Sequence, residues 1–187
     1  FGLLVTAPLS LLAAALIKIE SRGPVLFRQL RMGRGGKAFT LLKFRSMRVS
    51  GGGALVTASG DDRITKIGRI LRRTKIDELP ELWNIVRGEM SIVGPRPEMP
   101  EYVKLFESDY KRILSMRPGL TDFASLKYRD EAAILGTVAD PEHEYVTRIL
   151  PDKVKLALRY TELASVRVDL LLIGKTLLRL TGRRVTV

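Results

Sequence analysis

An uncharged, strongly apolar run covers residues 1–17 of the sequence. At about 1.5 Å per residue it would form roughly 25 Å of helix, slightly less than the ~30 Å hydrocarbon core of a bilayer. Pro8 lies in the middle of the run, where it removes a helical hydrogen bond and favours a break. The pattern predicts a membrane-inserted helix over residues 1–20. It leaves open whether this helix re-enters one leaflet, spans the bilayer or is buried in a protein core.

Shorter periodic segments follow the apolar run. Residues 39–44 predict a strand or buried segment, and the Gly-rich residues 50–60 predict a loop. Two apolar stripes at helical spacing predict helices, the first capped by Asp61 or Asp62: Ile64, Ile67 and Leu71, then Leu79, Leu82, Trp83 and Val86. Further helices are predicted over residues 99–116, 151–163 and 168–180. The last is amphipathic with a basic end (Arg179, Arg183 and Arg184), which fits a bilayer surface or a protein core equally well.

The positive charge is concentrated next to the apolar run. Residues 18–75 hold 15 Lys and Arg against three acidic residues, whereas residues 76–187 hold 17 of each and the whole chain carries +12. A basic block beside an apolar segment is typical of the cytoplasmic side of a membrane. We therefore expect anionic membrane lipids as a partner, with a solvated basic surface as the alternative.

The composition excludes several kinds of chemistry. The 187 residues include no Cys and a single His, which excludes a disulfide framework, a zinc site built on Cys or His, and a thiol nucleophile. Aromatic residues make up only 6%, and no recognised nucleic-acid motif is present, so we expect no nucleic-acid partner. The expected fold is α+β, mostly α, in a single membrane-associated domain with interfacial amphipathic helices.

The candidate chemistry lies between residues 72 and 97, in the stretch RRTKIDELPELWNIVRGEMSIVGPRP. Asp77 and Glu78 precede a helix whose first turn tolerates Pro80, because no internal donor is needed there. The free amides at a helix start favour bound anions and keep a carboxylate ionised. One carboxylate can attack phosphorus while the other helps hold a divalent metal. Taken alone, such a pair is more often only an acidic helix cap.

A rigid turn at the end of the same stretch presents an arginine. Pro95 and Pro97 fix the backbone on both sides of Arg96. A guanidinium held at a set place matches the bidentate recognition of a phosphate. Taken alone, the segment would fit a structural surface turn equally well.

Three long motifs together resemble one family, the bacterial sugar transferases, which are monotopic polyprenyl-phosphate glycosyl-1-phosphate (phosphoglycosyl) transferases. The motifs are SRGPVLFRQLRMGRGGKAFTLLKFRSMR, DDRITKIGRILRRTKIDELPELWNIVRGEMSIVGPRP and RPGLTDFA. The resemblance implies an N-terminal helix that is broken by a proline, here Pro8, and enters only the cytoplasmic leaflet. Residue 7 is Ala where Ser is common in the family.

The resemblance also implies a reaction. An Asp attacks the sugar-linked phosphate of a nucleoside-diphosphate sugar, commonly a UDP-sugar, and the phosphosugar then passes to polyprenyl (undecaprenyl) phosphate. Asp77 aligns with this nucleophile and Glu78 with the ligand of the Mg²⁺ cofactor. The residues that align with phosphate-contacting cations are Lys43, Arg72, Arg96 and, more weakly, Arg117.

The cellular setting also follows from the resemblance. It implies an enzyme at the bacterial inner (cytoplasmic) membrane, with residues 21–187 as a catalytic domain on the cytoplasmic face. The reaction would be the first membrane step of surface glycan or glycoconjugate assembly. One departure affects specificity: residues 121–125 read TDFAS where many members read TGWAQ, so no sugar identity is transferred. A membrane-anchored basic scaffold and a nucleic-acid-binding module without catalysis remain the rival functions.

Overall fold

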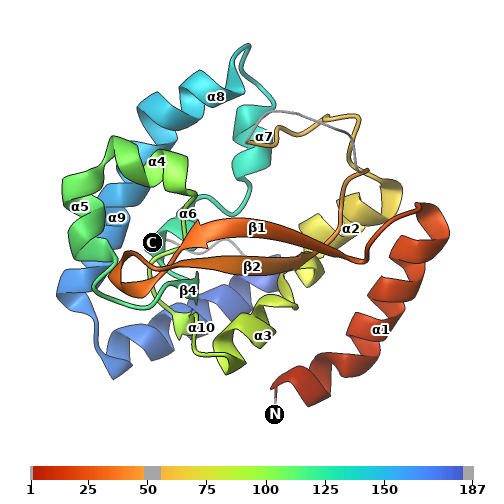
Figure 1. The fold of residues 1–187 in the computed structure, drawn as a ribbon, viewed down its shortest axis with the longest axis horizontal. Helices are drawn as coiled ribbons and strands as arrows, with labels where there is room; N and C mark the ends of the chain where they lie inside the picture. The colour runs from red at the N-terminus through yellow and green to blue at the C-terminus, as the bar shows by residue number, and fades with distance from the viewer. Residues whose placement is uncertain (1, 49–55, 183–187) are drawn as a thin grey trace.

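The computed structural model describes residues 2–48 and 56–182 (Figure 1). Most of these residues are helical, and the predicted fold, mostly α with few short strands, is confirmed. The α-helices are α1 (Gly2–Glu20), α2 (Lys66–Thr74), α3 (Glu81–Val86), α4 (Pro100–Leu105), α5 (Glu107–Ile113), α6 (Phe123–Lys127), α7 (Glu131–Leu135), α8 (Pro141–Glu144), α9 (Leu150–Leu163) and α10 (Val166–Leu180). Two 3₁₀ turns, η1 (Arg34–Gly36) and η2 (Ile76–Glu78), and one π-helical turn, η3 (Tyr145–Ile149), complete the helical elements.

Two small sheets hold the four strands among the described residues. β1 (Leu26–Met32) and β2 (Ala38–Phe44) form an antiparallel hairpin whose register runs from Leu26 opposite Phe44 to Met32 opposite Ala38. The strand predicted over residues 39–44 is therefore confirmed as β2. β3 (Ser91–Val93) pairs in parallel with β4 (Gly119–Thr121), which joins two motifs that are far apart in the sequence.

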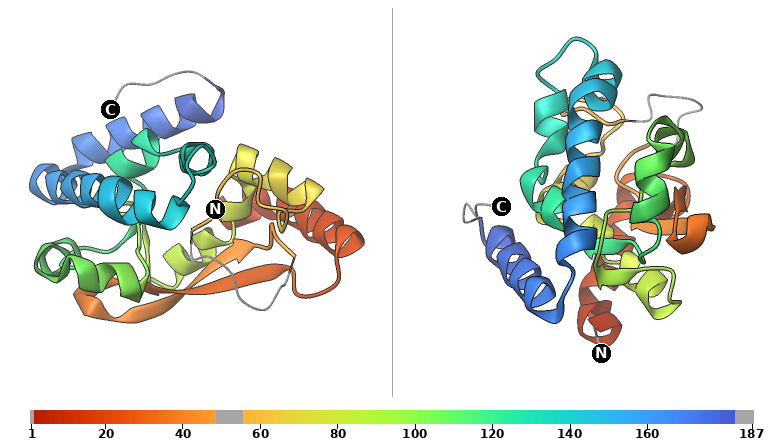
Figure 2. Two further views of the ribbon diagram at one scale, coloured as in Figure 1. Left: turned by 90° about the horizontal axis from the view of Figure 1, so that it is seen from above. Right: turned by 90° about the vertical axis from the view of Figure 1, so that its left-hand side faces the viewer.

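The helices form two groups that the β1–β2 hairpin connects. In the left view of Figure 2, α4, α5 and α8–α10 lie on one side and α1 and α2 on the other, with the hairpin running from one group to the other. In the larger group, α4, α5, η3 and α9 pack around the buried Tyr102, Ile113, Ile149 and Leu150, whereas Leu172 on α10 belongs to a second cluster. A separate cluster around Ala13, Ile17, Phe44 and Leu71 attaches α1 to β2 and α2.

α1 is the only described helix long and apolar enough to cross a membrane. Its mean hydropathy is 2.0, and only 11% of that apolar window is buried. Leu4, Leu11 and Ile19 are each more than 70% exposed. The helix is continuous through Pro8, and Figure 1 shows that its first turns run at an angle to the rest. The re-entrant path stays a prediction.

Two expectations about the helix starting near residue 64 turned out differently. The helix α2 begins at Lys66, and its cap is Thr65, whose hydroxyl accepts a hydrogen bond from the Gly68 amide at 2.9 Å. The predicted cap by Asp61 or Asp62 is wrong, because the Asp61 carboxylate instead accepts hydrogen bonds from the backbone amide and the guanidinium of Arg63.

Of the loop predicted over residues 50–60, residues 50–55 lie outside the described residues, as do Arg183 and Arg184 of the basic tail.

The apolar stripe predicted for the next helix is not buried as a whole, since Leu79 and Leu82 are partly buried and the other two residues are exposed. Trp83 and Val86 on α3 are 49% and 65% exposed, whereas Glu81 and Asn84 are completely buried. α3 thus turns its polar face inward, because partners for these buried polar side chains lie there. The Asn84 side chain donates to Thr40 O and accepts from the Leu42 amide, so it attaches α3 to β2.

The remaining helix predictions agree with the structure. Residues 99–116 form α4 and α5, which are separated at Phe106. Residues 151–163 lie in α9, and residues 168–180 lie in α10. Leu172 on α10 is fully buried, while Val166, Leu170 and Leu177 are exposed. One face of α10 therefore packs on the protein core, and another face presents apolar side chains outward.

Candidate active site

The chain turns sharply just ahead of the Asp-Glu pair. Lys75 ends α2 in the left-handed conformation, with φ of 60° and ψ of 17°. This is an uncommon state for a residue with a side chain and often marks a constrained functional segment. Asp77 and Glu78 follow in the 3₁₀ turn η2, before α3 begins at Glu81. Neither carboxylate caps α3, so the helix-cap alternative for this pair is wrong.

Asp77 is buried without a partner for one of its oxygens. Asp77 is only 7% exposed, and its Oδ1 makes no hydrogen bond. Burial, followed by the neighbouring charge of Glu78, raises the pKa of Asp77 above its ordinary value, although Lys43, Lys75 and Arg72 oppose the shift. An orphaned buried carboxylate oxygen is costly, and such groups in native proteins usually serve a ligand or a reaction.

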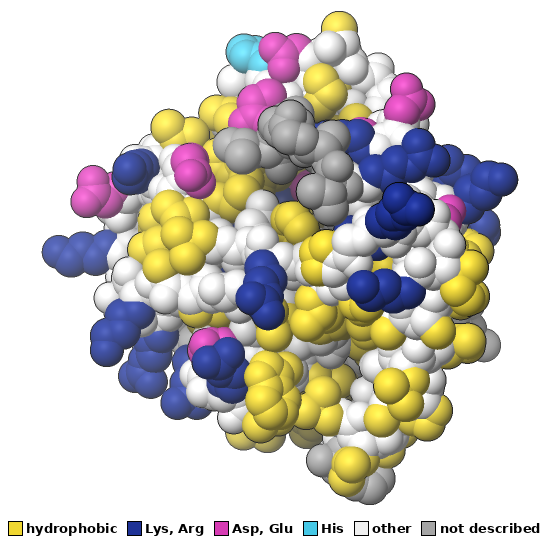
Figure 3. All heavy atoms as spheres, turned by 45° about the vertical axis from the view of Figure 1, so that its right-hand side comes forward, with side chains coloured by type: hydrophobic (Ala, Val, Ile, Leu, Met, Phe, Trp, Pro, Cys, Tyr) yellow, Lys and Arg dark blue, Asp and Glu magenta, His cyan; other side chains and the backbone are white. Residues whose placement is uncertain are grey.

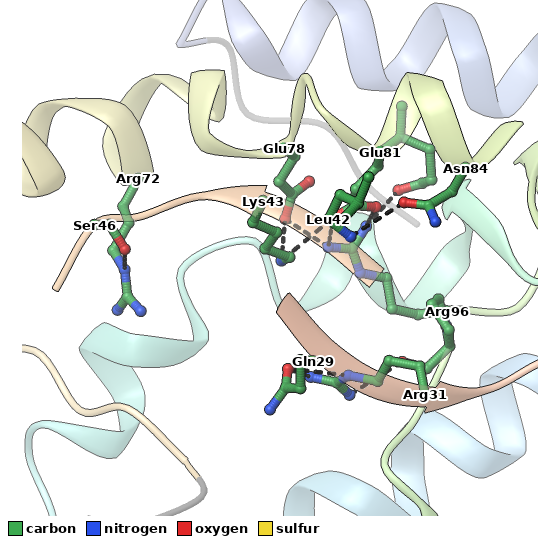
Figure 4. A network of polar contacts seen from close by, with 12 residues as sticks. Gln29, Arg31, Leu42, Lys43, Ser46, Arg72, Glu78, Glu81, Asn84 and Arg96 are labelled. Atoms are coloured by element: carbon green, nitrogen blue, oxygen red, sulfur yellow. Dashed lines mark hydrogen bonds and ion pairs between the residues drawn. The ribbon is translucent and has the colours of Figure 1, made fainter. Parts of the chain in front are cut away.

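Arg96 lies at the centre of a group of carboxylates (Figure 4). Its Nη2 is 2.6 Å from Glu78 Oε1 and 3.3 Å from Glu81 Oε1. Its Nη1 donates to Glu81 Oε2 at 3.4 Å and to Leu120 O at 2.9 Å. The guanidinium is thus held from two sides by Glu78, Glu81 and Leu120 O.

Lys43 approaches the same carboxylates from strand β2. Its Nζ is 3.2 Å from Glu78 Oε1 and 3.4 Å from Glu81 Oε1. Burial alone would raise the pKa of Glu78, but Arg96, Lys43 and Lys75 outweigh it and hold that pKa well below its ordinary value. Glu78 is therefore ionised, while its neighbour Asp77 has a raised pKa.

Sequence reasoning missed Glu81, which shares both cations with Glu78. Burial raises the pKa of Glu81, as does the charge of Glu78, while Arg96 and Lys43 oppose the shift. The spacing of the polar residues in the sequence could have indicated this role. Glu78, Glu81 and Asn84 recur every three residues, so they share one face of the η2–α3 segment. The apolar stripe beside them led to the opposite orientation.

Two glycines bring the turn that carries Arg96 against the RPG motif. A Cβ atom on Gly119 would lie 2.1 Å from the Gly94 amide nitrogen, and one on Gly94 would lie 2.5 Å from Arg117 O. Only glycine permits this approach of two backbones. The fully buried Asp122 accepts hydrogen bonds from the Arg96 amide and the Ser125 amide. Asp122, in the segment that departs from the family, thus supports the Arg96 turn.

The site opens into a cleft of about 1850 Å³. Asp77, Glu78 and the three strongest phosphate-binding candidates, Lys43, Arg72 and Arg96, all line it. The lining includes thirteen Lys and Arg residues against five Asp and Glu residues, so the cleft favours a polyanion. Its wall also includes Thr121 and Ser125 from the segment that departs from the family.

Two of the expected cations differ in their placement. Arg72 lies away from the Glu78–Arg96 group, with Nε 2.9 Å from Ser46 Oγ, and its guanidinium faces the same cleft (Figure 4). Arg117 is exposed and does not line the cleft. Its backbone carbonyl instead lies against Gly94. Of the residues expected to bind or react with substrate, all but Arg117 thus line one cleft, with Arg72 apart from the others.

The donor set fits a weakly held Mg²⁺ ion. Among residues 2–48 and 56–182, no group of three or more acidic or His side chains could hold a metal by itself. Mg²⁺ commonly takes one or two carboxylates together with substrate phosphates. Glu78 is ionised and 18% exposed at the cleft, and Asp77 next to it has an unpartnered oxygen. These two residues could hold the ion once a diphosphate supplied further oxygens.

The buried Asp77 and the partly exposed Glu78 thus lie in a cleft lined mainly by cations, in a molecule that also carries an exposed apolar helix. The sequence model of the family described as "Bacterial sugar transferase" matches residues 1–183, and the chain belongs to this family.

Curated relatives carry related names. The chain is 48% identical to the UDP-glucose:undecaprenyl-phosphate glucose-1-phosphate transferase of Caulobacter vibrioides, over 65% of this chain and 47% of the relative. It is 37% identical to the UDP-N-acetylgalactosamine-undecaprenyl-phosphate N-acetylgalactosaminephosphotransferase of Aeromonas hydrophila, over 91% of this chain and 38% of the relative. It is 33% identical to the exopolysaccharide production protein ExoY of Rhizobium meliloti, over 94% of this chain and 78% of the relative. The chain thus spans less than half the length of the first two.

Proposed function

We propose that this protein transfers a sugar 1-phosphate from a nucleoside-diphosphate sugar, a UDP-sugar in the first instance, to polyprenyl (undecaprenyl) phosphate. The observation that carries the proposal is the buried Asp77, with an unpartnered oxygen, in a cleft lined mainly by cations. The names of the Caulobacter and Aeromonas relatives support the donor and acceptor classes. The reaction would begin the assembly of a surface glycan or glycoconjugate, such as an exopolysaccharide.

The reaction proceeds in two displacements at phosphorus. In the first, Asp77 Oδ1 attacks the sugar-linked phosphate, the bond to the nucleotide oxygen breaks, and UMP leaves with that electron pair. An aspartyl-phosphosugar remains. In the second, a phosphate oxygen of the lipid attacks the same phosphorus, the bond to Asp77 breaks, and the carboxylate is regenerated as the lipid diphosphate sugar forms. Phosphoryl transfer depends mainly on positioning and charge neutralisation.

The cations of the cleft have separate tasks in this scheme. Arg96 and Lys43 lie beside the acid pair and would neutralise charge on the transferred phosphate. Arg72 lies farther along the same wall and would contact a second phosphate, either of the donor or of the lipid. The cleft wall also includes Leu79, Leu82 and Leu177, which suit the apolar chain of a prenyl acceptor.

Glu78 is the proposed ligand of Mg²⁺, with Asp77 next to it. A bound Mg²⁺ would supply charge neutralisation at the diphosphate and help orient it. Because an amide oxygen binds Mg²⁺ more weakly than a carboxylate, Glu78→Gln should keep a trace of turnover that rises with added Mg²⁺. Turnover in Glu78→Gln that equals the wild type at low Mg²⁺ would reject this role.

The membrane setting rests on α1 and its surroundings. Figure 3 shows hydrophobic side chains over α1 at the lower right of the molecule and Lys and Arg side chains above them. We infer that residues 1–20 insert into the cytoplasmic leaflet of the bacterial inner membrane, that anionic lipids attract the basic surface, and that residues 21–187 act at the cytoplasmic face. Cysteine-accessibility labelling of a tag placed before residue 1 tests the re-entrant path, since a periplasmic tag would mean a spanning helix.

One assay separates the proposed enzyme from its rivals. The full chain, in detergent with polyprenyl phosphate, is given a panel of UDP-sugars with and without Mg²⁺, and UMP release is measured. Mass spectrometry of protein quenched without lipid should find a phosphosugar on Asp77. No UMP from any donor would favour a membrane-anchored scaffold, and salt-sensitive binding of nucleic acid in its place would favour the nucleic-acid module.

A further inference from the structure

Glu81 is a carboxylate that cannot reach the cleft. It is 0% exposed and does not line the cleft that Glu78 lines. Its two oxygens contact only cations: Oε1 lies 3.3 Å from Arg96 Nη2 and 3.4 Å from Lys43 Nζ, and Oε2 lies 3.4 Å from Arg96 Nη1. A group without access to substrate can affect the chemistry only through the side chains that it holds.

Glu78 and Glu81 compete for the same two cations from different positions. Glu78 has the closer contact with Arg96, 2.6 Å against 3.3 Å, and it is 18% exposed at the cleft. Glu78 is also the proposed ligand of Mg²⁺. If Glu78 held a bound Mg²⁺, its oxygens would turn away from Arg96 and Lys43, which would then lose their nearest carboxylate.

We propose that Glu81 is a positioning residue that keeps Arg96 and Lys43 in place when Glu78 turns to the metal and the substrate. Of the two carboxylates, Glu78 is the exchangeable partner and Glu81 is the permanent one. The inference rests on the proposed function, because it assigns Glu81 a part in the same phosphosugar transfer.

The other fixed groups around Arg96 are insufficient for this task. Leu120 O accepts only from Nη1, and Asp122 accepts from the Arg96 backbone amide and not from its guanidinium. Asn84, which is buried on the same face of α3, bonds to β2 and to Glu89. Of the described groups that contact the guanidinium, Glu81 alone faces both Nη1 and Nη2 and also contacts Lys43.

Two conservative substitutions separate position from charge. Glu81→Gln removes the charge but keeps one acceptor oxygen that can still face Arg96 Nη2 and Lys43, while Arg96 Nη1 keeps its bond to Leu120 O. Glu81→Asp keeps the charge and both oxygens but withdraws them by one methylene group. Because misplacement of a catalytic group by about 1 Å can cost up to 100-fold in rate, we expect Glu81→Asp to lower kcat at least about tenfold. Glu81→Gln should recover most of that loss.

A binding measurement accompanies the kinetics. In Glu81→Asp the cations remain in the cleft and remain charged, so the calorimetric Kd for UMP with Mg²⁺ should change less than about threefold. In the Arg96→Lys background, Glu81→Asp should cost clearly less than its full tenfold, because it acts partly through Arg96. Glu89→Asp is the matched control, since Glu89 lies beyond the same helix and contacts Asn84 and Arg87.

The outcomes are distinct. Wild-type kcat in Glu81→Asp, an equal loss in Glu81→Gln, a parallel fall in UMP affinity, or full additivity with Arg96→Lys would each overturn the positioning role while leaving the proposed function intact. Thermal unfolding checks that both variants are folded. If Glu81→Asp proves unfolded, the test is kcat of Glu81→Gln against the wild type, and a loss of tenfold or more in that kcat would overturn the role. Absence of UMP release by the wild type would overturn the proposed function and this assignment together.

Discussion

Two arginine–carboxylate clusters lie on either side of Pro97, and they are built differently. On one side, Arg96 and Lys43 are shared by Glu78 and Glu81, while Asp77 next to them has an oxygen without a partner. On the other side, Arg31 lies 2.7 Å from Glu98 and also donates to Pro97 O. Apart from the buried Glu81, these charged residues line the same cleft.

The Glu98 cluster is fully satisfied. Glu98 Oε1 accepts from Arg31 and from the Met99 amide, and Oε2 accepts from the Tyr145 hydroxyl at 2.6 Å. Burial alone would raise the pKa of Glu98, but Arg31, Lys153 and these hydrogen bonds outweigh it and hold the pKa below its ordinary value. The cluster links β1, the segment after the Arg96 turn and the π-helical turn η3.

The difference between the clusters lies in unused bonding capacity. Where every donor and acceptor already has a partner, as around Glu98, the contacts contribute to stability and leave nothing for a ligand. Where a carboxylate oxygen is orphaned and two acids share two cations, as around Asp77, a bound anion or metal can complete the set. We therefore expect substitutions on the Arg96 side to change turnover and substitutions on the Glu98 side to change stability.

The largest effect is expected for Asp77→Asn. An amide lacks the anionic oxygen that attacks phosphorus, so turnover should fall at least about a thousandfold, and the phosphosugar adduct should disappear. Because the pKa of Asp77 is raised in the folded state, its charge opposes folding at neutral pH. The melting temperature of Asp77→Asn should therefore equal or exceed that of the wild type. Full activity, or an adduct on another residue, would reject the covalent mechanism.

A smaller loss of turnover is expected for Arg96→Lys. Lys keeps the charge but cannot reproduce the planar fork, so turnover should fall about tenfold or more, equivalent to about 1.4 kcal/mol. Steady-state kinetics measures it. The control is the same change in the Glu98 cluster, Arg31→Lys, which should leave kcat within about threefold of the wild type. If both substitutions reduce kcat equally, the distinction between the clusters fails.

Tyr145→Phe tests the stability side of the comparison. It removes a hydroxyl that donates to the buried, ionised Glu98, so the free energy of unfolding should fall by about 1.5 to 3 kcal/mol. Urea unfolding followed by circular dichroism measures the loss. UMP release per folded molecule should be unchanged, and a selective loss of turnover at full stability would place Tyr145 in the reaction.

The smallest effect concerns acid pH. Because the folded-state pKa of Glu98 is lowered from its ordinary value of 4.5, its stabilising contribution is present above that value and disappears as pH falls through the folded pKa. The gap in unfolding free energy between the wild type and Glu98→Gln should therefore narrow below about pH 4.5. A gap that stays constant from pH 7 to pH 3 would contradict an ionised Glu98.

Much of the molecule could be predicted from its sequence because the signals are local. An uncharged run sets the length and polarity of α1, and a short, mainly apolar segment indicates β2, whatever the rest of the chain does. The Asp-Glu pair, the Pro-framed Arg96 and Lys43 could be nominated in the same way, since long ordered motifs carry them. The family resemblance of those motifs implies one shared site, and these residues line one cleft.

Other features depend on which surfaces meet, and periodicity does not encode that. The stripe of Leu79, Leu82, Trp83 and Val86 pointed to a buried apolar face, yet α3 buries Glu81 and Asn84. These polar groups are stable inside because Arg96, from a turn fifteen residues later, and the backbone of β2 supply their partners. Burial of a polar group is acceptable only where such partners converge. The sequence alone indicated Lys43, Arg72, Asp77, Glu78 and Arg96 as site residues. Only the tertiary contacts decided that Glu78 faces the cleft while the buried Glu81 contacts Arg96 from the protein interior.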